Sequence, residues 1–165
     1  NSSAMEIVLS NVDILKILFT SFKIEKLCQV APTCKQWHSI CQLGDFWTTL
    51  NLEKRQISRA QVTELLRRHP SISSLNLSDL SFVDDSMLET VAASLPSLNK
   101  LELGYCQISE QQMGIIANRL TTLSELSIRD ASFGRFGPGE VVISHEHLTS
   151  LRAEGCRAGR LVVRC

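Results

Sequence analysis

The sequence predicts an α/β protein in which a small head of three helices precedes a short array of strand–helix units with parallel strands. The prediction rests on an apolar Leu-x-x-Leu-x-Leu pattern that recurs in one phase, and on an amphipathic segment that follows each of its first three copies. In residues 5–46, ahead of the array, the apolar residues follow the spacing of helices.

Five copies of the apolar pattern begin at Trp47, Ile72, Leu98, Leu123 and Leu148, so their starts are almost evenly spaced along the chain. Alternate residues of a strand point to opposite faces, so Leu-x-Leu places both leucines on one face and the intervening residue on the other. We therefore expect five short strands, each with a buried leucine face and a solvent-exposed face.

Three helices are expected after the first three strands, at residues 58–68, 84–95 and 109–120. Each segment opens with Ser or Asp, which are favoured capping residues. Apolar residues follow at three-to-four spacing, so one stripe of each helix should pack against the strands. The stripes comprise Val62, Leu65, Leu66, Met87, Leu88, Val91, Leu95, Met113, Ile116 and Leu120.

A strand–helix unit of this length resembles the leucine-rich repeat, and residues 101–108 (L-E-L-G-Y-C-Q-I) resemble its cysteine-containing subclass. The resemblance implies a solenoid with parallel strands and with helices on the convex side. Cys106 and Cys156 fall at the cysteine position, and Leu80 and Phe133 lie near it in other units. The alternative is an ordinary α/β domain in which leucines recur by chance.

The fourth unit departs from the pattern, because a glycine-rich stretch near 133–140 (F-G-R-F-G-P-G-E) replaces the helix. We interpret it as an inserted surface loop that is available for partner contact. Its spacing does not match a phosphate-binding loop. Val141–Ile143 and the tail Arg160–Cys165 have strand character, and the tail pairs with a neighbour or marks a truncation. Residues 1–4 are interpreted as a cloning remnant.

The head resembles the F-box. Residues 13–20 (D-I-L-K-I-L-F-T) resemble that family's E-L-L-x-x-I-F-S, residues 26–27 stand at its Asp-Leu, residues 34–37 (C-K-Q-W) reproduce its C-K-x-W, and residues 46–50 (F-W-T-T-L) resemble its closing L-W-x-x-L. The domains expected are thus an F-box-like head over 5–46 and leucine-rich repeats over 47–165.

An F-box followed by leucine-rich repeats implies a non-catalytic substrate receptor of an SCF-type ubiquitin ligase. The head would bind a Skp-type adaptor, and the repeats would bind a target protein. The implied adaptor contacts are Leu9, Ile14, Leu15, Leu18, Phe19, Leu27, Cys34 and Trp37.

The head departs from the family at two places. Ser10-Asn11 replaces the opening Leu-Pro, and Pro32 fits only if it lies in the first turn of the third helix. An alternative therefore stays open, in which the head serves only as the N-terminal cap of a repeat scaffold.

Target binding is expected on the strand face opposite the leucines, and Tyr105 is either an anchor or a cover for its strand end. The candidate target-binding residues are Asn76, Ser78, Lys100, Glu102, Tyr105, Glu125, Arg129, Arg152 and Glu154.

Composition excludes several other functions. Equal numbers of basic and acidic residues, 17 of each, predict no nucleic-acid or membrane partner, and the chain has neither a long apolar run nor a signal peptide. We expect a cytoplasmic or nuclear protein that is monomeric apart from its complex. Its six cysteines contain no C-x-x-C pair, so free thiols are expected.

No cofactor, metal or catalytic function is predicted. Cys34 and Cys41 would lie about 10 Å apart along one helix, too far for one zinc ion, so Cys34, His38 and Cys41 are interpreted as packing residues. His145 and His147 lack a third ligand and are interpreted as a solvated loop. No known catalytic motif is present, so an enzyme is not expected.

Overall fold

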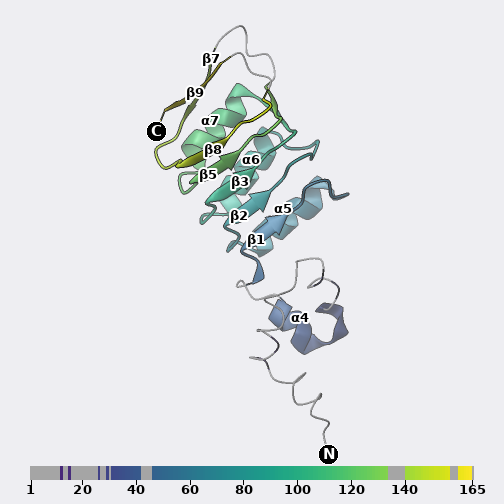
Figure 1. Cartoon of the computed structure of the whole chain (residues 1–165). Coiled ribbons are helices and arrows are strands. Elements are labelled where there is room, and N and C mark those ends of the chain that lie inside the picture. Colours follow the sequence, from purple (N-terminus) through teal and green to yellow (C-terminus); the bar gives the residue numbers. More distant parts are fainter. Residues whose placement is uncertain are drawn as a thin grey trace, which may run out of the picture. The chain divides into compact units, whose positions relative to one another are not determined.

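A computed structural model of the chain describes residues 12, 15, 26, 29, 31–41, 46–133, 140–156 and 160–164. The chain forms two compact units, Asn1–Thr48 and Thr49–Cys165 (Figure 1). None of the described helices has both the length and the apolar character needed to cross a bilayer.

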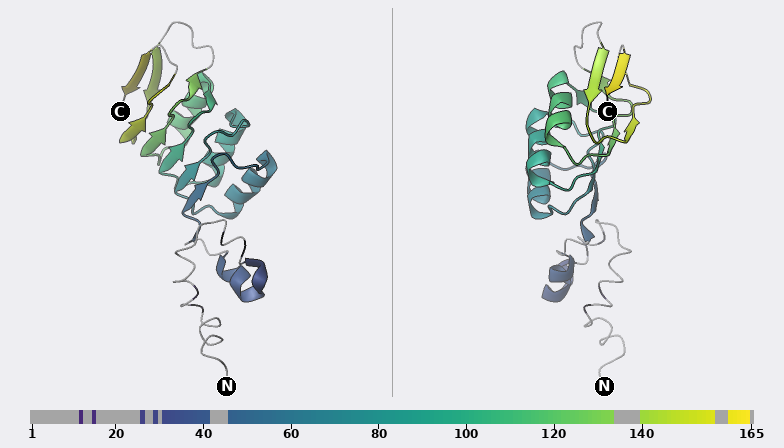
Figure 2. Two further views of the ribbon diagram at one scale, coloured as in Figure 1. Left: turned by 45° about the vertical axis from the view of Figure 1, so that its right-hand side comes forward. Right: turned by 90° about the vertical axis from the view of Figure 1, so that its left-hand side faces the viewer.

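The second unit is an α/β structure built on a parallel sheet whose strands pair in the order β1-β2-β3-β5-β8. The strands are β1 (Thr49–Asn51), β2 (Ser74–Asn76), β3 (Lys100–Glu102), β5 (Glu125–Ser127) and β8 (Ser150–Arg152). Helices cover one face of this sheet and leave the other face free of them (Figure 2). This parallel α/β architecture agrees with the predicted fold class.

The predicted phase of the strands is confirmed by their register. Leu50 pairs with Leu75, Leu75 with Leu101, Leu101 with Leu126, and Leu126 with Leu151. The first four of these leucines are at most 1% exposed, because the alternation of period two turns them all toward the helices. Leucines that are one repeat apart in the sequence thus become direct neighbours in space.

The three predicted helices are also confirmed, as α5 (Arg59–Arg68), α6 (Asp85–Ser94) and α7 (Glu110–Arg119). Each begins after a side chain that accepts a backbone N–H of the first turn: Ser58, Asp84 and Ser109. Such caps satisfy donors that have no partner within the helix. Buried residues from each helix complete the core, namely Val62, Leu66, Met87, Leu88, Val91, Met113 and Ile116.

A left-handed residue follows each strand of the sheet. Lys54, Asp79, Tyr105, Asp130 and Gly155 have φ between 54° and 72°, and they recur at the same interval as the strands. Backbone hydrogen bonds continue between neighbouring corners, as in Tyr105 N–H to the Arg129 carbonyl at 3.0 Å. These corners turn the chain out of each strand, and the first three lead toward α5, α6 and α7.

The cysteine position links successive units. Cys106 Sγ lies 3.6 Å from the Leu77 carbonyl oxygen, and Cys156 Sγ lies 2.8 Å from that of Ile128, one unit earlier in each case. Ala131, buried, occupies this position in the intervening unit. Phe133 lies two residues further along the chain and pairs with Ile108.

Two short parallel pairs lie outside the main sheet. One joins β4 (Gln107–Ile108) to β6 (Ser132–Phe133), and the other joins β7 (Glu140–Ser144) to β9 (Arg160–Arg164). The strand predicted at 141–143 and the strand character predicted for the tail are both confirmed, and the two strands pair with each other. Of the predicted glycine-rich loop, residues 134–139 lie outside the described residues.

The first unit contains a 3₁₀ helix, η1 (Ala31–Thr33), and the helix α4 (Lys35–Cys41). Leu15, Ala31, Ile40 and Cys41 form its buried cluster, against which Trp37 and Phe46 pack. The Trp47 indole N–H donates to the Cys41 carbonyl at 2.7 Å. Pro32 lies in η1 and not in the first turn of α4, so its missing N–H leaves α4 intact.

Candidate protein-interaction surfaces

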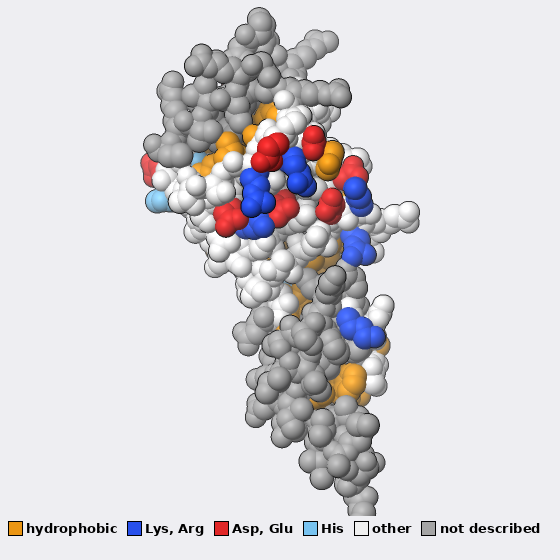
Figure 3. Space-filling model, viewed as in Figure 1, with side chains coloured by type: hydrophobic (Ala, Val, Ile, Leu, Met, Phe, Trp, Pro, Cys, Tyr) orange, Lys and Arg blue, Asp and Glu red, His pale blue; other side chains and the backbone are white. Residues whose placement is uncertain are grey.

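The free face of the sheet brings together most of the predicted target-binding residues. Acidic and basic side chains are intermingled on this face (Figure 3). Lys100 of β3 pairs laterally with Glu125 of β5, so charges of opposite sign lie on these neighbouring strands. A mixed pattern of this kind favours a partner with matching charges and selects against others.

Most side chains of this face remain accessible. Glu125 and Arg152 are exposed, and Arg129 and Glu154 are exposed just beyond their strands. Lys100 Nζ lies 2.9 Å from Glu102 Oε1, and both side chains are about one third exposed. Since exposed ion pairs contribute little to stability, these charges are free to exchange partners at small cost.

Ser78 is not part of this face, and its predicted role in target binding was wrong. Its side chain is buried, and its hydroxyl accepts the Gly104 N–H at 2.9 Å. Its own N–H donates to Asn76 Oδ1 at 2.9 Å, so the half-buried Asn76 also supports the turn. Strand β2 ends at Asn76, and the left-handed Asp79 redirects the chain, which places Ser78 inside.

Tyr105 lies at the corner after β3 and is 52% exposed. The ammonium of Lys54, two corners earlier, lies 5.9 Å from the centre of its ring. A cation at this distance is attracted by the negative face of an aromatic ring. Of the two roles that the sequence allowed, this exposure favours the anchor.

A hollow of about 1050 Å³ opens beside Tyr105, between two successive corners and the first turns of α6 and α7. Its acidic lining residues are Asp79, Asp84, Asp85 and Glu110, and no basic residue is among the described residues that line it. This hollow was not predicted from the sequence. The interval between the second and third copies of the apolar pattern was the available signal, since it aligns Asp79 with Tyr105 and Asp84 with Glu110.

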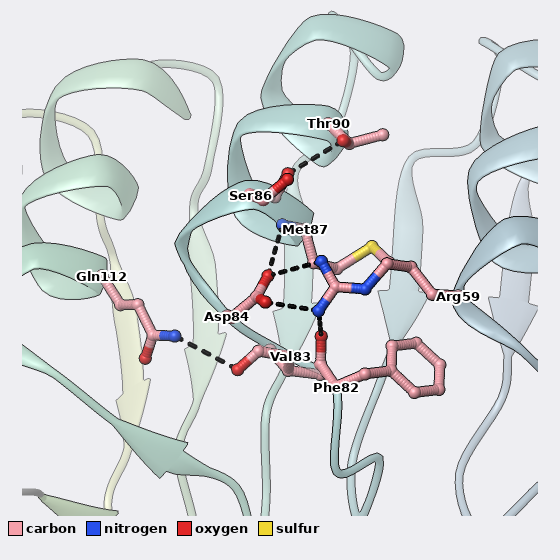
Figure 4. A network of polar contacts seen from close by, with 8 residues as sticks. All are labelled: Arg59, Phe82, Val83, Asp84, Ser86, Met87, Thr90 and Gln112. Carbon is pink, nitrogen blue, oxygen red and sulfur yellow. Dashed lines mark hydrogen bonds and ion pairs between the residues drawn. The ribbon is translucent and has the colours of Figure 1, made fainter.

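A polar network holds one wall of the hollow (Figure 4). The Arg59 guanidinium forms an ion pair with Asp84 and donates to the Phe82 carbonyl at 3.2 Å. Asp84 also accepts the Met87 N–H at 2.9 Å. The hydrogen bond from Arg59, followed by that from Met87, lowers the pKa of Asp84, so this carboxylate is ionised. Its negative charge is balanced by the positive charge of Arg59.

Gln112 closes the network from the next unit. It is buried, and its side-chain amide donates to the Val83 carbonyl at 3.1 Å (Figure 4). Its carbonyl oxygen accepts the Ser109 N–H at 2.9 Å, so the same side chain caps α7. Residues of α5, α6 and α7 thus position this wall before any partner arrives.

His145 is buried, which corrects its interpretation as part of a solvated loop, whereas Glu146 and His147 are exposed. The Nδ1 of His145 accepts the His147 N–H at 3.2 Å, so its Nε2 donates to the Leu120 carbonyl at 2.9 Å. His69 is buried as well, and this burial, followed by the charge of Arg68, lowers its pKa. Both histidines are structural residues.

The thiols of the repeats do not have the properties of nucleophiles. Burial raises the pKa of Cys106 and of Cys156, and a thiol, unlike a thiolate, is unreactive. In the head, Cys34 is exposed and Cys41 is buried. Among the described residues, no group of three His, Cys, Asp or Glu side chains is placed to hold a metal ion.

Most of the predicted adaptor contacts cannot be compared with the structure, because Leu9, Ile14, Leu18, Phe19 and Leu27 lie outside the described residues. Leu15 was predicted to contact the adaptor. It has no exposed surface and belongs to the buried cluster, so it is not accessible to a partner. Cys34 is exposed, and Trp37 packs partly against the cluster.

Val12 was not predicted as a contact, yet it is 41% exposed. Among the described residues, Val12 and Tyr105 are the exposed large hydrophobic side chains, one in each compact unit. Isolated exposed apolar residues are common, but these two coincide with the regions for which binding is predicted.

Models of known protein families provide no match to this chain. The resemblances in the sequence therefore depend on its motifs and spacing alone.

Proposed function

We propose that the chain is a non-catalytic substrate receptor of an SCF-type ubiquitin ligase. An F-box-like head over 5–46 binds a Skp-type adaptor, and a leucine-rich-repeat solenoid over 47–165 binds a target protein. The observation that carries the proposal is the pairing of five strands in sequence order, with the strands almost evenly spaced along the chain. Each strand therefore belongs to a unit that contacts only its neighbours, as in a solenoid.

Three further features support the assignment of the repeats. Each of the first three strands is followed by one helix, and these helices lie on one face of the sheet. A left-handed corner recurs in every unit. Cys106 and Cys156 each donate a hydrogen bond to the preceding unit, which is a role for a small thiol at a fixed repeat position.

The sequence motifs and one exposed residue support the assignment of the head. The C-K-Q-W motif at 34–37 leads into α4, which supplies Ile40 and Cys41 to the buried cluster. Val12 directly follows Ser10-Asn11, where the family has its Leu-Pro, and apolar residues at this place contact the adaptor in the F-box family. Its exposure makes Val12 available for such a contact.

The second candidate function is a repeat scaffold whose F-box-like head is only an N-terminal cap. The burial of Leu15 favours it, because one of the family's contact positions is used inside the head itself. In this case the repeats would still bind a partner, but no adaptor would associate.

Gel filtration of the purified chain with a Skp-type adaptor distinguishes the two functions. We expect co-elution, and we expect Val12→Asp to weaken adaptor binding on the order of 100-fold, because it places a charge in an apolar contact. Val12 is exposed, so the substitution should leave the head folded.

The matched control is Gln29→Asp, which adds the same charge at another exposed position of the head and should leave co-elution unchanged. A second variant, Leu18→Asp, tests a contact implied by the family resemblance. If the wild-type chain and adaptor elute separately, the receptor function is wrong and the cap function remains.

A further inference from the structure

The hollow beside Tyr105 differs from the rest of the surface in its charge. The free sheet face mixes both signs, whereas the described lining of the hollow is acidic and contains no basic residue. Arg59 neutralises Asp84. In the described part of the chain, Asp79, Asp85 and Glu110 form no ion pair, so these carboxylates are free to bind a cation.

The aromatic ring at the edge of the hollow is suited to the same kind of ligand. Tyr105 lines the hollow, and more than half of it is exposed. Lys54 already holds an ammonium group over this ring, at 5.9 Å from its centre. This contact is independent of the carboxylates, and it shows that the ring already attracts one cation of the chain, which a ligand's side chain would displace or meet from the other face of the ring.

The walls of the hollow are held in place before binding. Gln112 fixes the Val83 carbonyl, and Arg59 fixes Asp84 and the Phe82 carbonyl. Both Ser109 and Asp84 act as helix caps there. A ligand therefore meets a formed site and loses less affinity to the ordering of side chains.

From these features we propose that the hollow binds a basic segment of the target protein, with an Arg or Lys side chain placed between the ring of Tyr105 and the carboxylates of Asp79, Asp85 and Glu110. The proposal commits to a peptide segment because the hollow lies at the corners after β2 and β3, in the unit proposed to bind a target protein, and its acidic lining complements a basic side chain. It rests on the proposed function of the repeats as the target-binding part.

The test uses the single tyrosine of the chain as a local probe. The full chain is prepared with isotope-labelled tyrosine, and its ring signal is followed by NMR during titration with a short peptide in which arginine alternates with glycine. The comparison peptide contains citrulline, a neutral analogue, in place of arginine. We expect a saturable shift with the arginine peptide, which weakens as salt is added, and no shift with the citrulline peptide.

Variants assign the shift to the hollow. Asp85→Asn and Glu110→Gln should each weaken arginine-peptide binding about two- to five-fold, as expected for single exposed ion pairs. The matched control is Glu146→Gln, which removes an exposed carboxylate that does not line the hollow and should leave binding unchanged. Circular dichroism checks that each variant remains folded.

The proposal would be overturned by no shift of the Tyr105 signal, by an equal shift with the citrulline peptide, or by equal weakening from Glu146→Gln. An equal shift with spermine would also overturn it, because the hollow would then be a general cation site and not a peptide site. The titration contains no adaptor, so separate elution of the chain and the adaptor would not change its result. Conversely, a titration without a shift would not affect the test of adaptor binding.

Discussion

Replacement of Leu101 by alanine is expected to lower the free energy of unfolding by about 2–5 kcal/mol, which is the range for truncation of a buried leucine. Leu101 has no exposed surface and lies in β3, between Leu75 of β2 and Leu126 of β5. Neighbouring units close over it on both sides, so the cavity should not collapse easily. Urea denaturation followed by circular dichroism measures the change.

Glu102→Ala is the matched control for Leu101→Ala, because Glu102 is the next residue on the same strand and lies on the free face. It removes only the partly exposed ion pair with Lys100, so a loss below about 1 kcal/mol is expected. Equal losses for the two variants would contradict the assignment of the leucine face as the core.

Replacement of Gly155 by alanine is expected to destabilise the second unit by about 1–3 kcal/mol. Gly155 has φ of 72°, and a Cβ atom there would lie 2.1 Å from Asp130 Oδ1 and 3.0 Å from Asp130 Cγ. The variant must therefore tolerate a left-handed alanine and also displace the Asp130 side chain from the neighbouring corner. Thermal unfolding of the two proteins measures the difference.

Gly114→Ala provides a control of opposite sign. Gly114 lies in α7, and an added Cβ would meet no atom within 4 Å. Alanine favours the helix by about 0.5–1 kcal/mol over glycine, so this variant should be more stable than the wild type. A stabilising Gly155→Ala would show that the corner does not require glycine.

The strands and helices of the second unit were predictable because the apolar residues follow two periodicities, that of a strand and that of a helix. Leu101 and Leu103 alternate as in a strand, and Met113 and Ile116 follow at helical spacing after Ser109, a strong cap. The nearly constant interval then aligned the strands without any knowledge of their contacts. The third head helix was predictable in the same way from Trp37 and Ile40.

The left-handed corners were not predictable, since four of the five positions hold a residue other than glycine. Asp79 and Asp130 belong to a residue type that tolerates this conformation, but Lys54 and Tyr105 do not signal it. The error at Ser78 has the same origin. Alternation extended from Asn76 predicts an outward side chain, whereas the chain has already left the strand and turns inward.

The interval between the second and third copies aligns residues of the hollow beside Tyr105, but the hollow itself was not predictable, for a related reason. Its carboxylates come from two units and lie at corners and first helical turns, where no periodic pattern indicates the direction of a side chain. The burial of Leu15 was not predictable either, because family resemblance identifies a contact position without showing which atoms this chain leaves exposed.

Hydrogen exchange of the chain with and without a Skp-type adaptor tests the central claim most directly, because it reports on the head and the repeats at once. The proposal predicts that the adaptor slows amide exchange within residues 5–46 and leaves it unchanged in β2, β3 and β5, whose free face awaits the target. Unchanged exchange in the head, or slowed exchange confined to those strands, would contradict the proposed division between an adaptor-binding head and target-binding repeats.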